Sequence, residues 1–302
     1  MQNNRVMIKS GGCLLVSLMM LNMSFSASVQ AKVIKEERSL YRNIFVEDTG
    51  DKRCLKFSVK RKTSSQSCIY KSKPNELVFD YAKYVMTSLV FNAAPKNVLI
   101  IGLGGGTLSN NLLVMYPDIA IDNVEIDPAV VRVAIDYFDF KQTDKVVSHV
   151  QDGRIFIKRA LRKKQQYDLI ILDAFNGEYI PEHLLTKEFL EETKALLSEQ
   201  GVLVANTFSS SKLLHHESAT YHAVFGDFYS IKKSSNSGNR VLVMPNTTLT
   251  DKALQERAQL LSKPLAEFNV ELTSMLELIQ LEKDEKTDYR ILTDQYSPAN
   301  LL

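Results

Sequence analysis

From residue 97 onward, short apolar runs alternate with stretches that have a helical period. Residues 98–101 read Val-Leu-Ile-Ile without a polar interruption, which is typical of a strand covered on both faces of its sheet. Similar strands are expected at 120–124, 146–150, 169–172 and 202–205, with helices between them at 108–115, 129–137, 155–162 and 187–197. Strands that alternate with helices predict an α/β fold with a doubly wound, mostly parallel sheet.

The remaining segments suggest how this sheet is extended and flanked. Residues 33–73 read as short strands joined by basic turns, and residues 74–92 as one helix. An antiparallel pair of strands is expected at 228–231 and 240–244, and two helices interrupted at Pro264 within 251–281. The domains expected after an N-terminal segment 1–31 are a small β-strand domain at 32–75, the α/β domain at 76–248 and a helical extension with a tail at 249–302.

The N-terminal segment has the composition of an export signal. Arg5 and Lys9 precede an apolar run at 13–25, and Ala31 ends a short stretch suited to cleavage. About a dozen apolar residues are too few to span a bilayer comfortably, and no later segment reaches the roughly 18 that a membrane span needs. We predict a signal peptide at 1–31 and a periplasmic or secreted protein. The alternative is an uncleaved anchor helix.

The net charge of the chain limits the kinds of partner that the protein is expected to bind. The formal net charge is +2, and Arg5 and Lys9 supply all of it, because the chain from Lys32 onward carries 35 basic and 35 acidic residues. A general nucleic-acid binder would need a basic excess to hold phosphates, so we expect no nucleic-acid partner. An apolar fraction of 45% also argues against disorder.

Two cysteines remain after the predicted signal, in two strand-like runs around a basic stretch at 60–64. A hairpin register that opposes Val59 and Thr63 also places Cys54 opposite Cys68. An oxidising compartment would allow a disulfide between them. The alternative is two independent buried thiols, and both interpretations stay open here.

Four strand ends carry residues that suggest a ligand site, because ligands of such sheets bind at the carboxyl ends of the strands. Residues 102–107 read Gly-Leu-Gly-Gly-Gly-Thr, and glycines let the backbone turn tightly and approach a ligand. Glu125, about twenty residues further on, is placed to hold both hydroxyls of a ribose. Asp152 is placed to accept from an adenine amino group, and Asp173 ends the fourth strand.

These turns favour one class of ligand. A nicotinamide dinucleotide is disfavoured, because the third glycine of the G-x-G-x-x-G pattern falls on Thr107. The glycine loop and the two acids together favour an S-adenosyl nucleoside. Each feature also has a structural interpretation, a tight turn for the loop and a helix N-cap for Glu125 or Asp152. We expect no metal site, because His215 and His222 have no carboxylate partner at the usual ligand spacing.

Residues 34–208 resemble the spermidine synthase family, whose members have a small β-strand domain followed by a Rossmann-like catalytic domain. The matching pieces are 41–46, Gln66, Tyr81, 98–106, 124–127, 152–153 and 167–173. The resemblance implies that Gln66 and Glu125 bind the nucleoside ribose and that Asp152 binds adenine. The glycines that it implies at the same donor are Gly102, Gly104, Gly105 and Gly106.

The resemblance also implies a reaction. The donor would be decarboxylated S-adenosylmethionine or S-adenosylmethionine, and the nominal reaction is transfer of an aminopropyl group to a small-molecule amine, a diamine such as putrescine. Asp173 would take the proton from the attacking amine, because an ammonium must lose a proton before its nitrogen attacks carbon. Tyr81 and Asn176 would lie at the substrate, and a homodimer is a further expectation.

Three positions depart from the family pattern. The glycine loop of the family continues with an Asp that meets the donor ammonium, and the position here is Thr107. The second acid of the catalytic turn is Asn176, and a family Gln is replaced by Ala82. Each lost charge-assisted contact to an ammonium costs roughly 1.5–3 kcal/mol. Two such losses would weaken ammonium binding on the order of a hundred- to ten-thousand-fold.

A second resemblance gives the alternatives. Residues 102–107, 125–128 and 137–138 also resemble the spermidine-synthase-like methyltransferases, whose donor keeps a carboxylate that an uncharged Thr107 would suit. The alternative to aminopropyl transfer is therefore methyl transfer from S-adenosylmethionine to an amine or a protein. A third interpretation is a noncatalytic exported module that binds a nucleoside or a polyamine, because adenosyl donors are made inside cells.

Overall fold

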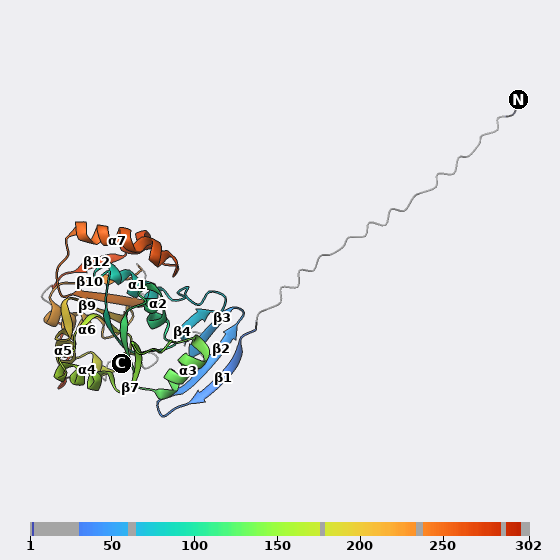
Figure 1. The fold of residues 1–302 in the computed structure, drawn as a ribbon, viewed down its shortest axis with the longest axis horizontal. Helices are drawn as coiled ribbons and strands as arrows, with labels where there is room; N and C mark the ends of the chain where they lie inside the picture. The colour runs from blue at the N-terminus through green and yellow to red at the C-terminus, as the bar shows by residue number, and fades with distance from the viewer. Residues whose placement is uncertain are drawn as a thin grey trace.

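The computed structural model describes residues 2, 30–59, 65–175, 179–233, 238–284 and 288–296. In these ranges the chain forms a four-stranded sheet and an eight-stranded sheet with helices on both faces (Figure 1). The α/β fold predicted from the alternation of strands and helices is confirmed, as is the small β-strand unit before it. Asn176, one of the expected substrate residues, and most of the predicted signal peptide lie outside the described residues.

The four-stranded sheet is an antiparallel meander in sequence order. Its strands are β1 (Lys32–Arg38), β2 (Asn43–Thr49), β3 (Lys52–Lys56) and β4 (Ser65–Tyr70). Its apolar face buries Ile44, Val46, Leu55 and Ile69 against helix α3 (Pro128–Phe138) of the larger unit. Figure 1 shows the sheet leaning on α3 at one side of the molecule.

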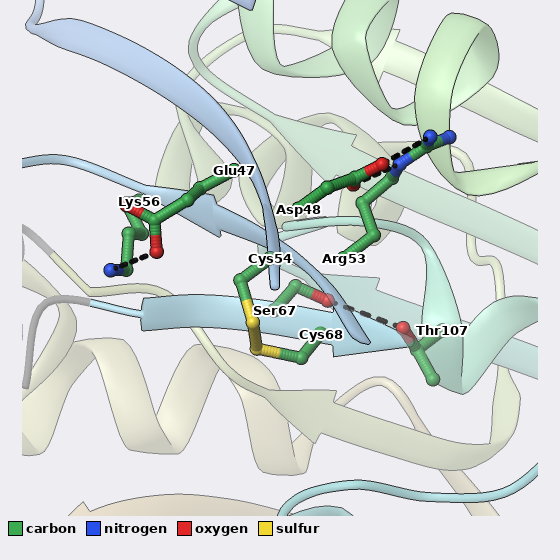
Figure 2. The surroundings of a disulfide bond; sticks show 8 residues. All are labelled: Glu47, Asp48, Arg53, Cys54, Lys56, Ser67, Cys68 and Thr107. Atoms are coloured by element: carbon green, nitrogen blue, oxygen red, sulfur yellow. Dashed lines mark hydrogen bonds and ion pairs between the residues drawn. A yellow bond between two sulfur atoms is a disulfide. The ribbon is translucent and has the colours of Figure 1, made fainter. Parts of the chain in front are cut away.

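The hairpin of β3 and β4 is closed by a disulfide. Cys54 and Cys68 are directly opposed in the register, their Cα atoms are 4.1 Å apart, and their sulfur atoms are bonded (Figure 2). Of the two interpretations that the sequence left open, the structure shows the disulfide and not two separate thiols. Both cysteines are buried, so the crosslink fixes β4 from inside the small sheet.

The eight-stranded sheet has the order β12-β10-β11-β9-β8-β5-β6-β7. Its parallel part consists of β5 (Asn97–Ile101), β6 (Ala120–Glu125), β7 (Val146–Val150), β8 (Tyr167–Leu172) and β9 (Leu197–Phe208). The antiparallel edge consists of β10 (Phe228–Ile231), β11 (Asn239–Pro245) and β12 (Ile279–Glu282). Because β5 and β8 are neighbours in the sheet although far apart in sequence, their carboxyl ends meet in its centre.

Helices cover both faces, each over its own buried cluster. One face packs against α1 (Asp80–Thr87), α2 (Thr107–Met115) and α7 (Asp251–Ala266). The other packs against α4 (Gly153–Arg162), α5 (Lys187–Lys194) and α6 (Leu214–Phe225). This two-sided cover explains why the central strands read as continuous apolar runs. None of the helices in the described part of the chain is long and apolar enough to cross a membrane.

Several element boundaries differ from the sequence prediction. The helix expected over 74–92 is only α1 followed by a 3₁₀ turn, Ser88–Val90. The helix expected to stop at Pro264 continues to Ala266, because Leu261 and Leu265 are both buried and anchor its last turn. Residues 279–281, the end of the region expected as helix, belong instead to strand β12, which pairs with β10 and completes the sheet edge. The short helix α8 (Leu272–Leu276) precedes this strand.

Candidate functional site

A cavity of about 610 Å³ lies at the carboxyl ends of β5, β6 and β8, where the small sheet meets the large one. Its volume is within the range of small-molecule sites, about 300–1,000 Å³. The expected site residues that line it are Gln66, Tyr81, Gly102, Gly104, Gly106, Glu125, Asp152 and Asp173. Gly105 lies just behind this wall, packed between Ser67 and Phe138.

Gly102 allows the ends of β5 and β8 to come together. Its φ is +99°, and a Cβ atom there would lie 2.3 Å from the backbone oxygen of Asp173. A side chain at this position would therefore displace Asp173 itself. Gly106 is also left-handed, with a φ of +73°, and a Cβ would lie 2.5 Å from the ring of Phe140. The loop is thus shaped by close packing as well as by approach to a ligand.

Glu125 stands at the end of β6 with both carboxylate oxygens fixed by backbone donors. Oε2 accepts from the N–H of Leu103 at 3.1 Å, and Oε1 accepts from the N–H of Asp127 at 3.0 Å. Burial raises the pKa of Glu125, and these hydrogen bonds together with the charge of Arg42 oppose the rise. Each oxygen has a second lone pair, so the carboxylate is oriented and still able to accept from two hydroxyls. The N-cap of α3 is Asp127 rather than Glu125.

Asp152 is the N-cap of α4 and also lines the cavity. Its Oδ1 accepts from the N–H of Ile155 at 3.0 Å, which makes it the N-cap of α4. Its Oδ2 lies 2.9 Å from Nε2 of His183, a cavity residue on the segment after β8. The N-cap hydrogen bond fixes the carboxylate at the cavity wall. The role as a helix N-cap is therefore compatible with a contact to a ligand.

Asp173 directly follows β8 and lines the cavity. Its Oδ1 accepts from Nδ2 of Asn206 at 2.8 Å, and the hydroxyl of Tyr81 donates to the same carboxylate. Burial raises the pKa of Asp173 to about 7, and the two hydrogen bonds limit the rise. Burial and the charge of Asp173 raise the pKa of Tyr81 well above 10, which keeps its donor proton in place. A carboxyl group with this pKa is suited to accept a proton near neutral pH.

Thr107 meets the small sheet at the first residue of α2. Its Oγ1 lies 3.2 Å from Oγ of Ser67 on β4, next to the disulfide (Figure 2). Gln66 precedes Ser67 on the same strand, so β4 supplies two neighbouring polar residues to the site region. This part of the cavity therefore presents a neutral hydroxyl pair beside the glycine loop.

Four further residues of the cavity were not expected as site residues from the sequence. Phe175 and Phe208 pack with ring centroids 4.8 Å apart, and Asn206 and Asn239 line the same cavity. Asn206 is near the end of β9, which is the same positional signal that singled out Asp173. An uncharged amide simply gave no indication of chemistry.

Two further cavity residues were missed for another reason. Arg42 extends from the turn between β1 and β2, with its guanidinium 4.2 Å over the ring of Phe57. His183 reaches the cavity from an irregular segment. Arg42 lies within 41–46, one of the pieces that match the family, but neither residue follows a strand end or a periodic pattern, so neither side chain was expected at the site.

Comparison with known proteins agrees with this geometry. Residues 79–233 match the spermine/spermidine synthase domain. The chain is 49% identical over 275 residues to a polyamine aminopropyltransferase of Vibrio vulnificus (strain CMCP6), an alignment that covers 90% of this chain and 92% of the relative.

Solved structures show the same fold. A probable spermidine synthase from Corynebacterium glutamicum ATCC 13032 superposes with a TM-score of 0.68 at 20% identity, over 88% of this chain and 98% of the other. Human Methyltransferase-like protein 13 in complex with SAH gives a TM-score of 0.53 at 26% identity, over 74% of this chain and 96% of the other. The resemblance noted in the sequence is confirmed: this chain belongs to the spermine/spermidine synthase family.

Proposed function

We propose that this protein transfers an aminopropyl group from decarboxylated S-adenosylmethionine to a diamine such as putrescine. The observation that carries the proposal is Asp173, a carboxylate with a pKa of about 7 in the same cavity as Glu125 and Asp152. Its pKa fits removal of a proton from an amine at neutral pH. The polyamine aminopropyltransferase of Vibrio vulnificus, 49% identical, supports the same reaction.

The proposed donor end uses three polar groups. Glu125 accepts from the two ribose hydroxyls with the lone pairs that its backbone hydrogen bonds do not use. Gln66 reaches the same sugar from β4, and Asp152 accepts from the adenine amino group beside His183. The glycine loop lets the backbone lie close to the donor.

The proposed acceptor end surrounds Asp173. The substrate ammonium gives one proton to Asp173, and its nitrogen then attacks the carbon next to the sulfonium sulfur. A C–N bond forms, the C–S bond breaks with its electron pair on sulfur, and a neutral thioether nucleoside leaves. The aromatic rings of Phe175 and Phe208 suit the amine because a cation is attracted to an aromatic face.

A second candidate function is methyl transfer from S-adenosylmethionine to an amine or a protein. The specific observation that favours it is the neutral pair of Thr107 and Ser67 beside the glycine loop, which offers hydroxyl groups and no carboxylate. Hydroxyls can donate to the carboxylate of S-adenosylmethionine, whereas a carboxylate would repel it. Similarity to human Methyltransferase-like protein 13 supports the same alternative.

Calorimetric titration with decarboxylated and ordinary S-adenosylmethionine, followed by product analysis with putrescine, separates these candidates. Tighter binding of the decarboxylated donor and formation of an aminopropylated diamine would support the proposed reaction. Tighter binding of the ordinary donor with a methylated product would replace it by methyl transfer. Binding of neither donor would leave a noncatalytic module and remove the assigned role of Asp173.

We also propose that the protein is exported to the periplasm or secreted. The disulfide between Cys54 and Cys68 supports this location, because such bonds persist mainly in oxidising compartments. Fractionation of the producing cells, with mass spectrometry of the amino terminus, tests it. A chain beginning near Lys32 outside the cytoplasm is expected, and an uncleaved chain in the cytosol would contradict export.

A further inference from the structure

We propose that Asn239 and Asn206 form a two-amide relay that positions the carboxylate of Asp173. Nδ2 of Asn239 donates to Oδ1 of Asn206 at 2.9 Å, and Nδ2 of Asn206 donates to Oδ1 of Asp173 at 2.8 Å. All three residues line the cavity. The inference rests on the proposed function, in which Asp173 accepts a proton, and it assigns positioning roles to two residues that lie beyond that acid.

The relay determines which way the amide of Asn206 points. An asparagine side chain has an acceptor oxygen on one side and two donor protons on the other. Because Asn239 donates to the oxygen, the NH₂ group of Asn206 must face Asp173. The opposite orientation would set NH₂ against NH₂ at Asn239 and oxygen against the carboxylate at Asp173. Only 2% of Asn206 is exposed, so water has little room to replace the missing donor.

The two asparagines are placed by the pairing of β9 and β11. Asn206 is opposite Val241 and Asn239 is opposite Phe208, so the two asparagines are diagonal neighbours on one face of the sheet. On the opposite face, Arg240 and Thr207 are hydrogen-bonded to each other. The register that brings the two amides together is therefore fixed from both sides of the sheet.

The orientation has a chemical consequence for Asp173. A donor that points at the carboxylate favours its charged form and counteracts the effect of burial. The hydrogen bond from Asn206 lowers the pKa of Asp173 against the larger upward effect of burial. Together with the hydrogen bond from Tyr81, the relay thereby lowers the pH above which Asp173 is ready to accept a proton.

The kinetic experiment compares Asn206→Ala, Asn239→Ala and Asn239→Asp with the unmodified protein across pH 5.5–9.5. In the unmodified protein the acid limb of kcat is expected near pH 7. In Asn206→Ala it should move upward by on the order of one pH unit, with a smaller move in Asn239→Ala. Asn239→Asp should move it further than Asn239→Ala, because a carboxylate at 239 attracts the NH₂ of Asn206 and turns its oxygen toward Asp173.

Activity at pH 7 should then fall about five-fold in Asn206→Ala and recover at high pH, while the donor KM changes less than two-fold. Asn246→Asp is the matched control, because Asn246 follows β11 and donates to the backbone oxygen of Ser198 rather than to the relay. Its acid limb should stay in place. Equal loss at all pH values, or a raised KM with an unmoved limb, would show a merely structural role and overturn the relay.

A titration without turnover separates this inference from the proposed function. The difference infrared spectrum between the unmodified protein and Asp173→Asn reports protonation of Asp173 directly. Its midpoint should rise when measured in the Asn206→Ala and Asn239→Asp backgrounds. A raised midpoint in a protein that transfers no group would keep the relay and reject the function. An unmoved midpoint in folded variants of an active enzyme would reject the relay alone.

Discussion

Two opposing effects act on the carboxyl group of Asp173. Burial favours its neutral form, and two hydrogen-bond donors favour its charged form. Tyr81 donates from α1 and Asn206 from β9, so the carboxylate is fixed from two different elements. The close contact of Gly102 with the backbone at Asp173 fixes the main chain as well. A proton acceptor needs this degree of positioning, because the efficiency of proton transfer depends on geometry before it depends on pKa.

Asp173→Asn should therefore abolish most of the turnover and leave the donor bound. We expect kcat to fall by roughly 10²–10⁴-fold, the range typical of a lost general base. The donor affinity should change little, because the proposed donor contacts are made by Glu125 and Asp152 and not by Asp173. Steady-state kinetics and calorimetry on the same preparation measure both quantities. Full activity in the variant would exclude Asp173 as the proton acceptor.

Gly102→Ala should destabilise the fold through a clash and an unfavourable φ together. The left-handed backbone alone costs roughly 1–2 kcal/mol. The added Cβ at 2.3 Å from the backbone oxygen of Asp173 must also push the strand end aside. Gly226→Ala is the matched control, since Gly226 has a φ of +71° with nothing within 4 Å of its Cβ. Urea unfolding should show a larger loss for Gly102→Ala, and equal losses would mean that the close approach is unimportant.

Single charged residues of the site are easier to recognise in the sequence than residues whose role depends on packing. Glu125, Asp152 and Asp173 were selected because acids at strand ends are conspicuous, and all three line the cavity. Gly105 was grouped with its neighbours, although its position against Ser67 and Phe138 depends on a fold contact that no local pattern encodes. Asn206 was missed because its role depends on the carboxylate that it faces.

Among the elements, strand β4 links the small sheet to the site. It is crosslinked to β3 through Cys54 and Cys68, and its Ser67 contacts Thr107 at the start of α2 (Figure 2). Gln66 lies on the same strand and lines the cavity. The disulfide thus fixes the strand that carries part of the proposed donor site.

Replacing both cysteines, Cys54→Ser with Cys68→Ser, should lower stability and weaken donor binding. The two cysteines are 14 residues apart, and closing a loop of that size stabilises a fold by about 3 kcal/mol in the chain-entropy model. Urea unfolding and calorimetry with the preferred donor measure the two effects. A reducing agent should reproduce both in the unmodified protein and change nothing in the variant. Unchanged donor affinity would show that β4 keeps its place without the crosslink.

Element types were easier to predict than element ends. The parallel strands followed from continuous apolar runs, because burial on both faces leaves a strong compositional signal. Strand β12 was mistaken for helix because residues 279–282 form only a four-residue run at a partly buried sheet edge, too short for its apolar–polar alternation to be distinguished from the end of a helix. The helix expected at 74–92 was too long at its start. Leu77 fits the helical period of apolar residues and is buried, but regular helical structure begins only at Asp80.

For the whole molecule, the raised pKa of Asp173 predicts a dependence of stability on pH. A carboxyl group whose folded pKa lies above its unfolded value of about 3.9 binds more protons in the folded state between these two values. The contribution of Asp173 to the free energy of unfolding is therefore fully present below about pH 4 and is lost as the pH rises toward 7. Burial also raises the pKa of Glu125 and the pKa of Glu217, as it does for Asp173.

Comparing the protein with Asp173→Asn isolates the contribution of one group. The urea midpoint of the unmodified protein should fall more between pH 5 and pH 8 than that of the variant, which has no titrating carboxyl at this position. The variant should consequently gain relative stability at pH 8. Parallel declines in the two proteins would mean that Asp173 titrates near its unfolded value and is not strongly affected by burial.

The cavity draws its walls from two separate sheets, with Gln66 on one and Glu125, Asp152 and Asp173 at the strand ends of the other. A ligand that touches both walls acts as a bridge, and the energy of its contacts adds to the apolar packing of the small sheet on α3. When the cavity is saturated with such a ligand, the small sheet and the large sheet should unfold as one cooperative unit. Amide exchange in β1–β4 would then slow together with exchange in β5–β8, even in strands that the ligand never touches.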